Sequence, residues 1–278
     1  MRDKWSAIIV LNWNNFADTK ECIESTISQD ENVDIYLIDN ASSKHEQEAL
    51  ENLNHAWKFG ELVINDENKG FAKAHSDLLH DLMERYDYFF LLNNDTKAKE
   101  NLLHVLKGAI NSTDPDMISC KMINYWDHKI MDNAGHKMLS SGEIIPLGHG
   151  EAVDNFNQKF ENIGACAGAA LYSSKMLKDI GLFDDYFETG YEDAELGLRA
   201  FIAGYDCIYE PNAVVYHKMG QSIKKVFNYD YTLKIQCNIF YTYLKLVHWQ
   251  VIAINFLPWL FRLLLIVLID IIAWRPNT

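Results

Sequence analysis

The feature that most constrains the fold is a regular alternation of short apolar runs and amphipathic segments in the first half of the chain. Repeated strand–helix units indicate a mostly parallel sheet with helices on both faces, so we expect an α/β fold. Apolar, β-branched runs predict buried strands at 5–12, 33–39, 61–65, 88–93 and 117–122. Helical spacing predicts helices between them at 18–29, 46–53, 71–86 and 101–110.

The second half is less regular. Scattered Gly residues and a Pro predict hairpins and loops over 127–162, as an insertion on the α/β core. Two short strands are expected at 207–209 and 214–216, on either side of Pro211. Helices are predicted at 173–180, with Ser173 or Ser174 as the cap, at 192–203, closed by Gly204, and at 229–248.

Charge and cysteine content limit which binding partners and which cellular compartment are expected for this chain. The chain has 25 Lys and Arg against 39 Asp and Glu, a formal net charge of -14, which makes a nucleic acid a poor partner. Its five cysteines lie far apart without a CxxC pair, so the spacing predicts neither a disulfide framework nor a zinc site. A reducing, cytoplasmic environment is the simpler interpretation, and the polar residues 1–6 do not resemble a signal peptide.

The C-terminal segment 251–274 is almost wholly apolar, with Arg262 and Asp270 as its only charges. Its uninterrupted apolar run, 263–269, is much shorter than the ~20 residues of a bilayer span. A helix that begins at Pro258 and carries Trp259 and Trp274 near its ends favours the membrane surface. The alternatives are a buried helix of a soluble protein and a homodimer contact.

Polar clusters follow four of the predicted strands, at 12–14, 39–42, 65–70 and 93–96. Parallel sheets bind ligands beyond the carboxyl ends of their strands, so these clusters predict one polar crevice. Asp39 would accept a hydrogen bond from the imide N–H of a pyrimidine base, or else cap the next helix. Asp95 is the only acid in its cluster and would ligate a hard divalent cation, or else be an ordinary loop residue.

Two later segments carry further candidate residues. Glu192 and Asp193 open a predicted helix, whose dipole favours ionised carboxylates, and one of them could act as a general base. An ordinary helix start is the alternative. The small residues of 164–170 allow another molecule to approach the backbone, although they also suit tight packing. His217 follows a strand and could serve a metal or a phosphate.

Taken in order, these stretches make the chain resemble the family 2 inverting glycosyltransferases of the GT-A fold, especially the bacterial branch that contains rhamnosyltransferases. The resemblance covers residues 5 to about 220. It is carried by IIVLNWNN (8–15), LIDNAS (37–42), NKGFAKAH (68–75), FFLLNNDT (89–96), GACAGAALYSSKMLKDIGLFDDYF (164–187), GYEDAELGLRA (190–200) and VVYH (214–217).

The resemblance implies a role for each matching residue. It places a nucleotide base near Leu11, Asn12 and Asp39, and the donor diphosphate near Asn68 and Gly70. Asn93, Asn94 and Asp95 occupy the position of the family's DxD motif, with Asn93 where many relatives have Asp. Asp95 and His217 would then hold Mg²⁺ or Mn²⁺. Asp193 would be the catalytic base, with Glu192 beside it.

The resemblance also implies the reaction. A GT-A domain over 1–225 would transfer a sugar from a dTDP- or UDP-linked donor to a glycan or lipid-linked glycan acceptor. The helical segment 226–278 would hold the enzyme on the inner face of the cell membrane or form a homodimer. A sugar-nucleotide pyrophosphorylase is one alternative, although residues 12–15 lack its Gly-rich basic loop. A non-catalytic carbohydrate-binding protein is the other.

Overall fold

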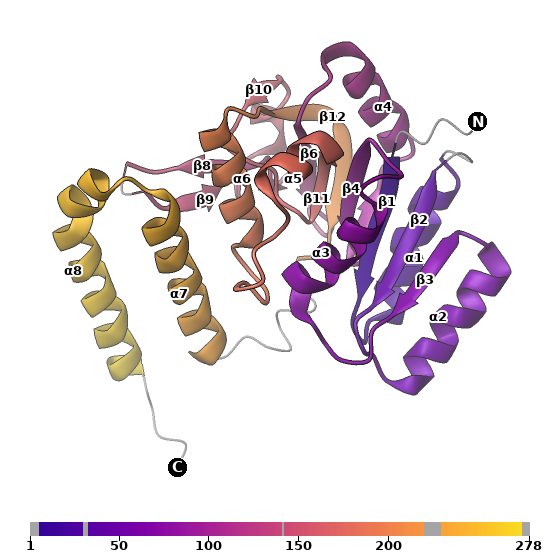
Figure 1. The fold of residues 1–278 in the computed structure, drawn as a ribbon, viewed down its shortest axis with the longest axis horizontal. Helices are drawn as coiled ribbons and strands as arrows, with labels where there is room; N and C mark the ends of the chain where they lie inside the picture. Colours follow the sequence, from indigo (N-terminus) through magenta and orange to yellow (C-terminus); the bar gives the residue numbers. More distant parts are fainter. Residues whose placement is uncertain (1–5, 30–32, 141, 220–228, 274–278) are drawn as a thin grey trace.

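The computed structural model describes residues 6–29, 33–140, 142–219 and 229–273. Its central sheet has the order β10-β12-β6-β11-β4-β1-β2-β3 (Figure 1). The parallel part consists of β1 (Ser6–Asn12), β2 (Asp34–Asp39), β3 (Gly60–Ile64) and β4 (Tyr88–Asn93). These strands confirm the predicted α/β fold; Trp5, predicted to open the first strand, lies outside the described residues.

Helices cover both faces of the sheet because successive strand side chains point to opposite faces. Ile9 of β1 faces a core shared with α3 (Gly70–Leu82), α5 (Ser174–Ile180) and α6 (Glu192–Ala203). Ile8 and Val10 face the other core, shared with α1 (Phe16–Ile27), α2 (Lys44–Trp57) and α4 (Leu102–Thr113). The predicted cap of α5 is Ser173, whose Oγ accepts a hydrogen bond from the Met176 N–H at 3.2 Å.

The second half of the sheet is mixed. β11 (Ala169–Ser173) runs antiparallel between β4 and β6 (Met117–Asn124), and β12 (Cys207–His217) runs parallel to β6. The edge strands β5 (Thr96–Ala98), β7 (Met131–Asn133) and β10 (Phe160–Glu161) are antiparallel additions. The predicted insertion also contains a separate hairpin of β8 (His136–Met138) and β9 (Ile144–Pro146), and the 3-10 helix Val153–Asn155.

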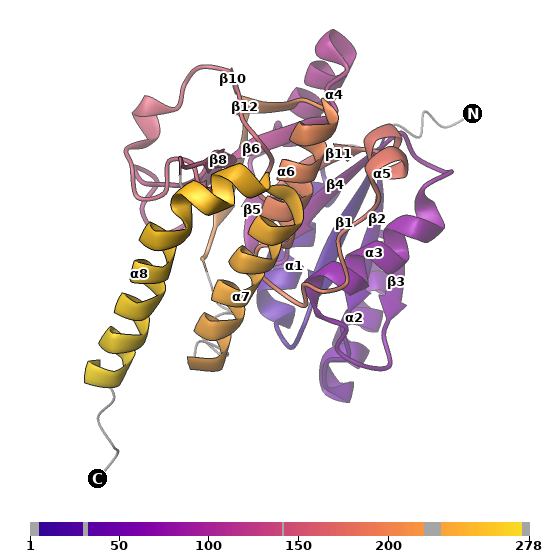
Figure 2. The ribbon, with the colours of Figure 1, turned by 60° about the vertical axis from the view of Figure 1, so that its left-hand side comes forward.

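Two sequence predictions about proline were wrong. Residues 207–217 form one strand rather than two, because Pro211 lies where the register shifts between Glu210 and Val214, so its missing N–H interrupts no regular ladder. The C-terminal helix does not begin at Pro258: α8 (Trp249–Ala273) runs through it. A proline inside a helix removes one hydrogen bond and favours a bend, and Figure 2 shows α8 changing direction along its length.

The predicted division between 225 and 226 lies outside the described residues, but α7 (Tyr229–Leu246) is closely tied to the preceding domain. Asn238 donates a hydrogen bond to the carbonyl of Gly190 at 2.7 Å, and Lys245 pairs with Asp184 at 2.6 Å. In contrast, Figures 1 and 2 both place α8 on the outside of the molecule, beyond α7. The appendage therefore has one integrated helix and one projecting helix.

Candidate active site

The carboxyl ends of β1 and β2 form the first part of the site. Asn12 and Asp39 are paired in register, and the Asn12 amide donates a hydrogen bond to Asp39 Oδ1 at 2.9 Å. The Thr19 hydroxyl holds the other side of that amide, at 2.7 Å from Asn12 Oδ1. Leu11 precedes them, half-buried against the core. The predicted meeting of these strand ends is confirmed.

Asp39 is completely buried, with 0% exposure. Its Oδ2 accepts hydrogen bonds from the Ser42 N–H and the Gln47 amide, both at 3.0 Å. The cap of α2 is instead Ser43, whose Oγ accepts a hydrogen bond from the Glu46 N–H at 3.4 Å, so the alternative that Asp39 caps this helix is wrong. The other oxygen, Oδ1, accepts only the Asn12 amide among the described hydrogen bonds, and contact of Asp39 with a base stays a prediction.

Asn40 joins the end of β2 to the 65–70 loop. Its amide donates to Asn68 Oδ1 at 2.7 Å, and its Oδ1 accepts from the Asn65 amide at 3.0 Å. Asn68 Oδ1 also accepts from the Gly70 N–H at 2.9 Å. Asn68 and Gly70 therefore lie together at the sheet edge, with Asn68 exposed.

Gly70 also touches the loop before α6. It has a φ of +73°, and a Cβ on it would lie 2.4 Å from the carbonyl oxygen of Glu188. That same oxygen accepts a hydrogen bond from the Phe71 N–H at 2.5 Å. The close approach and the left-handed backbone both require glycine here, and they connect the two halves of the domain.

The second part of the site is a row of three charged side chains. His217 Nε2 lies 3.2 Å from Asp95 Oδ1, and its Nδ1 lies 2.5 Å from Asp132 Oδ2. Pairing of β5 with β12 places Thr96 opposite His217, which brings Asp95 beside the imidazole. Asp132 comes from β7 and was not among the sequence candidates.

This row fits a divalent cation. Metal-binding histidines usually use one ring nitrogen for the metal while the other is held by a carboxylate, and here Asp132 holds Nδ1 while Nε2 faces Asp95. Burial alone would lower the pKa of His217, but the hydrogen bonds to Asp132 and Asp95 outweigh it and raise the pKa to about 10. Without a cation the imidazole therefore carries a proton between two carboxylates, and a cation would take that proton's place.

The two asparagines before Asp95 differ in their surroundings. Asn94 is buried, and its amide donates to the Thr19 hydroxyl at 2.9 Å. Asn93 is half-buried, and its N–H donates to the carbonyl of Gly168 at 2.9 Å. Asn94 therefore supports the loop from inside, whereas Asn93 lies against the small-residue segment 165–168.

Asp193 lies in the first turn of α6, on the other side of the same segment. Its Oδ2 accepts a hydrogen bond from the Ala167 N–H at 3.0 Å. Gly168 contacts Asn93, so the motif that ends β4 and the first turn of α6 are bonded to adjacent residues of one short segment. The small residues predicted to admit another molecule therefore contact both Asn93, which precedes Asp95 by two residues, and Asp193.

Glu192 differs from its neighbour. Its side chain is buried, its Oε2 has no hydrogen-bond partner among the described residues, and burial together with the charge of Asp193 raises its pKa to about 8. Glu192 therefore holds its proton near pH 7. This favours Asp193 as the carboxylate that could accept a proton.

The β8–β9 hairpin supports the start of α6. The Tyr191 hydroxyl accepts a hydrogen bond from the Ile144 N–H at 2.8 Å, and His136 Nε2 lies 3.8 Å from Asp193 Oδ2. Neither Asp132 nor His136 was a candidate from the sequence. The only available signal was their place in the polar stretch DNAGH, 132–136, within the predicted insertion of hairpins and loops.

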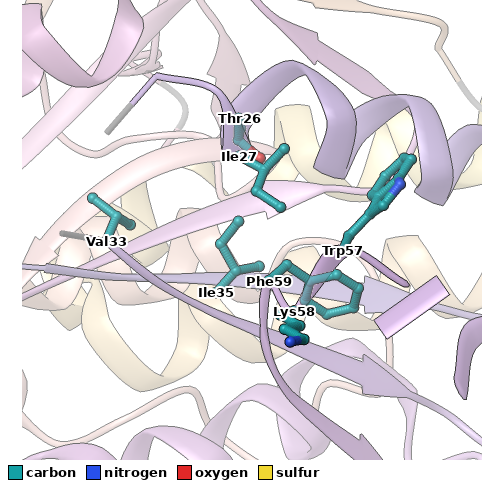
Figure 3. Close-up of a pocket in the computed structure, with 7 residues that line it drawn as sticks. All are labelled: Thr26, Ile27, Val33, Ile35, Trp57, Lys58 and Phe59. Carbon is teal, nitrogen blue, oxygen red and sulfur yellow. The ribbon is translucent and has the colours of Figure 1, made fainter. Parts of the chain in front are cut away.

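The cavity in Figure 3 lies away from these groups. It has a volume of about 200 Å³ and is lined mainly by apolar side chains near the start of β2, including Val33, Ile35 and Phe59. Asp39 ends β2 at the opposite edge of the sheet. The cavity therefore contributes nothing to the polar site.

Comparison with known proteins agrees with this geometry. The family model described as glycosyl transferase family 2 matches residues 7–181, more than half of the chain. No curated protein matches.

Solved structures share the fold. A structure of GalNAc-T7 with UDP, GalNAc and Mn²⁺ has a TM-score of 0.63 and 15% identity, over 77% of this chain and 43% of that one. Residues 1–349 of S. aureus TarS give 0.56 and 12%, over 87% and 72% of the two chains. The mannosyltransferase PcManGT from Pyrobaculum calidifontis, in complex with GDP-Man and Mn²⁺, gives 0.55 and 16%, over 80% and 59%. The chain thus spans less than half of the GalNAc-T7 chain.

The family match, the mixed sheet and the ordered polar strand ends lead to one assignment: this chain has the GT-A fold and belongs to glycosyl transferase family 2.

Proposed function

We propose that this chain is an inverting glycosyltransferase that moves a sugar from a dTDP- or UDP-linked donor to a hydroxyl of a glycan or lipid-linked glycan, in bacterial surface polysaccharide synthesis. The observation that carries the proposal is that one short segment, 164–170, is hydrogen-bonded both to Asn93, two residues before Asp95, and to the carboxylate of Asp193, while Asp95 pairs with His217. The family match favours this activity over the pyrophosphorylase alternative. The assembled acidic groups favour it over a non-catalytic carbohydrate-binding protein.

Each group has a separate task in the proposed reaction. Asp95 and His217 Nε2 would hold Mg²⁺ or Mn²⁺, and Asp132 would keep the imidazole oriented by accepting its Nδ1–H. Bound there, the cation supplies positive charge beside the leaving diphosphate. Asp193 would remove the proton of the acceptor hydroxyl as that oxygen attacks the anomeric carbon from the opposite face. A single displacement inverts the anomeric centre.

The proposal of a nucleotide-sugar donor is supported by the residues at the strand ends and by the similar solved structures. Asn68 and Gly70 would line the diphosphate. The structures of GalNAc-T7 and PcManGT both contain Mn²⁺, which supports a divalent cation here. GalNAc-T7 is bound to UDP and PcManGT to GDP-Man, so the preference of this chain for dTDP or UDP depends on Asp39 and its acceptance of an imide N–H.

The test is a donor panel assayed by nucleotide release, with the anomeric configuration of the product read by NMR. Asp193→Asn should reduce transfer by about 10²–10⁴-fold, because it keeps the shape and removes the base. Asp185→Asn is the control, since Asp185 is exposed in the loop that leads to α6. Retention of configuration, or an Asp193→Asn rate within a few-fold of wild type, would contradict the proposed mechanism.

We further propose that the enzyme is cytoplasmic and lies on the inner face of the cell membrane through α8. None of the described helices is long and apolar enough to cross a bilayer. However, α8 exposes large apolar side chains: Ile254 is 77% exposed, Leu257 72% and Phe261 69%. The predicted anchors Trp259 and Arg262 have side chains outside the described set, and Trp274 lies beyond the described residues.

Flotation with anionic liposomes tests this location. Leu257→Glu combined with Phe261→Glu should leave the protein unbound while the wild type floats, because two charges would have to enter the apolar layer. Leu244→Glu on α7 is the control for an exposed apolar residue outside α8. If the wild type stays in the soluble fraction and dimerises through α8, the segment is an oligomer interface and the membrane proposal is wrong.

A further inference from the structure

Three potential metal ligands from distant parts of the chain, one of them Asp193, lie close together. They are His136 on β8, Cys166 in the small-residue segment, and Asp193 itself. One ligand atom from each lies within 4.8 Å of the other two, and His136 Nε2 is 3.8 Å from Asp193 Oδ2. The spacing of cysteines in the sequence predicts no such site, because only one of the ligands is a cysteine.

The imidazole of His136 is poorly satisfied by the protein alone. The residue is only 6% exposed, and its Nδ1 has no hydrogen-bond partner among the described residues. The ring nitrogen that faces Asp193 is Nε2, so a metal held between the two residues would bind through Nε2. Burial lowers the pKa of His136, and the nearby charge of Asp193 opposes this effect.

We propose that His136, Cys166 and Asp193 form a binding site for Zn²⁺, with water as the fourth ligand. Nitrogen, sulfur and carboxylate oxygen are the atoms that zinc takes, at bond lengths that put tetrahedral ligands roughly 3.3–3.7 Å apart. The three side chains would need to close by about 1 Å. The Cys166 thiol gives its proton to solvent as the zinc–sulfur bond forms.

This site differs in chemistry from the row of Asp95, His217 and Asp132, which offers no sulfur. Mg²⁺ prefers oxygen ligands, whereas a thiolate selects softer ions such as Zn²⁺. Zinc bound here would engage the carboxylate of Asp193 and prevent it from taking a proton. The inhibition, though not the binding, rests on the function proposed above.

Zinc binding can be measured without any substrate. The full chain is stripped of metal, equilibrated with excess Mg²⁺ to fill the hard site, and titrated with Zn²⁺ against a chromophoric zinc indicator. We expect one equivalent to bind, and at least tenfold weaker affinity in Cys166→Ser and in His136→Gln. Cys237→Ser and His80→Gln, which change an exposed cysteine and an exposed histidine, should bind zinc as the wild type does.

Substitution with Co²⁺ gives a second, spectroscopic measurement. It tests directly whether the Cys166 sulfur binds the metal, which a structural role of Cys166 would not produce. Co²⁺ in place of zinc should produce a thiolate-to-cobalt absorption band in the wild type, and this band should be absent in both Cys166→Ser and Cys166→Ala. The proposal is overturned if the wild type takes up no zinc in excess Mg²⁺, or if Cys166→Ser binds it unchanged. Zinc binding through Cys166 in a chain without transferase activity would refute the proposed function and leave this site standing.

Discussion

Acid should destabilise this protein through one buried histidine, His75 of α3. The residue is 1% exposed, its Nδ1 lies 2.8 Å from the carbonyl oxygen of Phe71, and its ring packs 4.0 Å from the ring of Phe71. Burial lowers the pKa of His75 from the ordinary 6.5 to about 4, against the opposing effect of the Phe71 carbonyl. Since Phe71 also binds Glu188, this histidine supports the junction at Gly70.

The magnitude follows from the two pKa values. Between pH 6.5 and 4 the unfolded chain binds the proton and the native protein does not, so stability rises with pH in this window. The contribution is fully present above pH 6.5 and is lost as the pH falls through 4. In total it amounts to about 3 kcal/mol, of which about 2 kcal/mol is lost by pH 5.

Urea unfolding at pH 7.5 and pH 5 measures this loss. His75→Leu has similar volume and cannot titrate, so its free energy of unfolding should fall by about 2 kcal/mol less than that of the wild type over this pH range. His80→Gln removes an exposed histidine of the same helix and should behave as the wild type. The comparison uses the change in the free energy of unfolding between the two pH values, so any pH-independent destabilisation caused by the leucine cancels. An equal fall in His75→Leu and wild type would refute the argument.

Three further predictions concern the site. Asp132→Asn should weaken Mn²⁺ binding about 10–100-fold in a metal titration, because the amide no longer holds His217 Nδ1–H as a carboxylate does; unchanged affinity would show that Asp132 does not orient the imidazole. Exhaustive chelation should abolish transfer and added Mn²⁺ should restore it, whereas full activity without metal would remove Asp95 from its proposed role. Gly70→Ala should lower the free energy of unfolding by roughly 2–4 kcal/mol, because it adds a clash with Glu188 to the left-handed backbone. Gly204→Ala has a similar φ of +88° and open space around it, so it should cost only about 1 kcal/mol; equal losses would mean that the Glu188 contact does not matter.

Local pattern predicted most of the elements. β4 and α6 have the bounds expected from the sequence, because each is a run of consecutive residues closed by a local signal such as Gly204. The predictions failed where a neighbouring strand decides the outcome. Pro211 interrupts the local pattern of β12, yet pairing with β6 continues the strand on both sides of it.

The sequence by itself determined which polar residues end the parallel strands, and therefore that Asn12, Asp39 and Asp95 belong to one sheet edge. A strand end lies in a few consecutive residues, and parallel strands bring their carboxyl ends to the same side. Only the tertiary structure decided which of these groups are buried in hydrogen bonds with their neighbours and which lie beside a further potential metal ligand. His217 meets Asp95 across 122 positions and Asp132 across 85, through pairing of β12 with β5 and of β6 with both β12 and β7. Such contacts leave no local pattern, because they depend on which strands become neighbours.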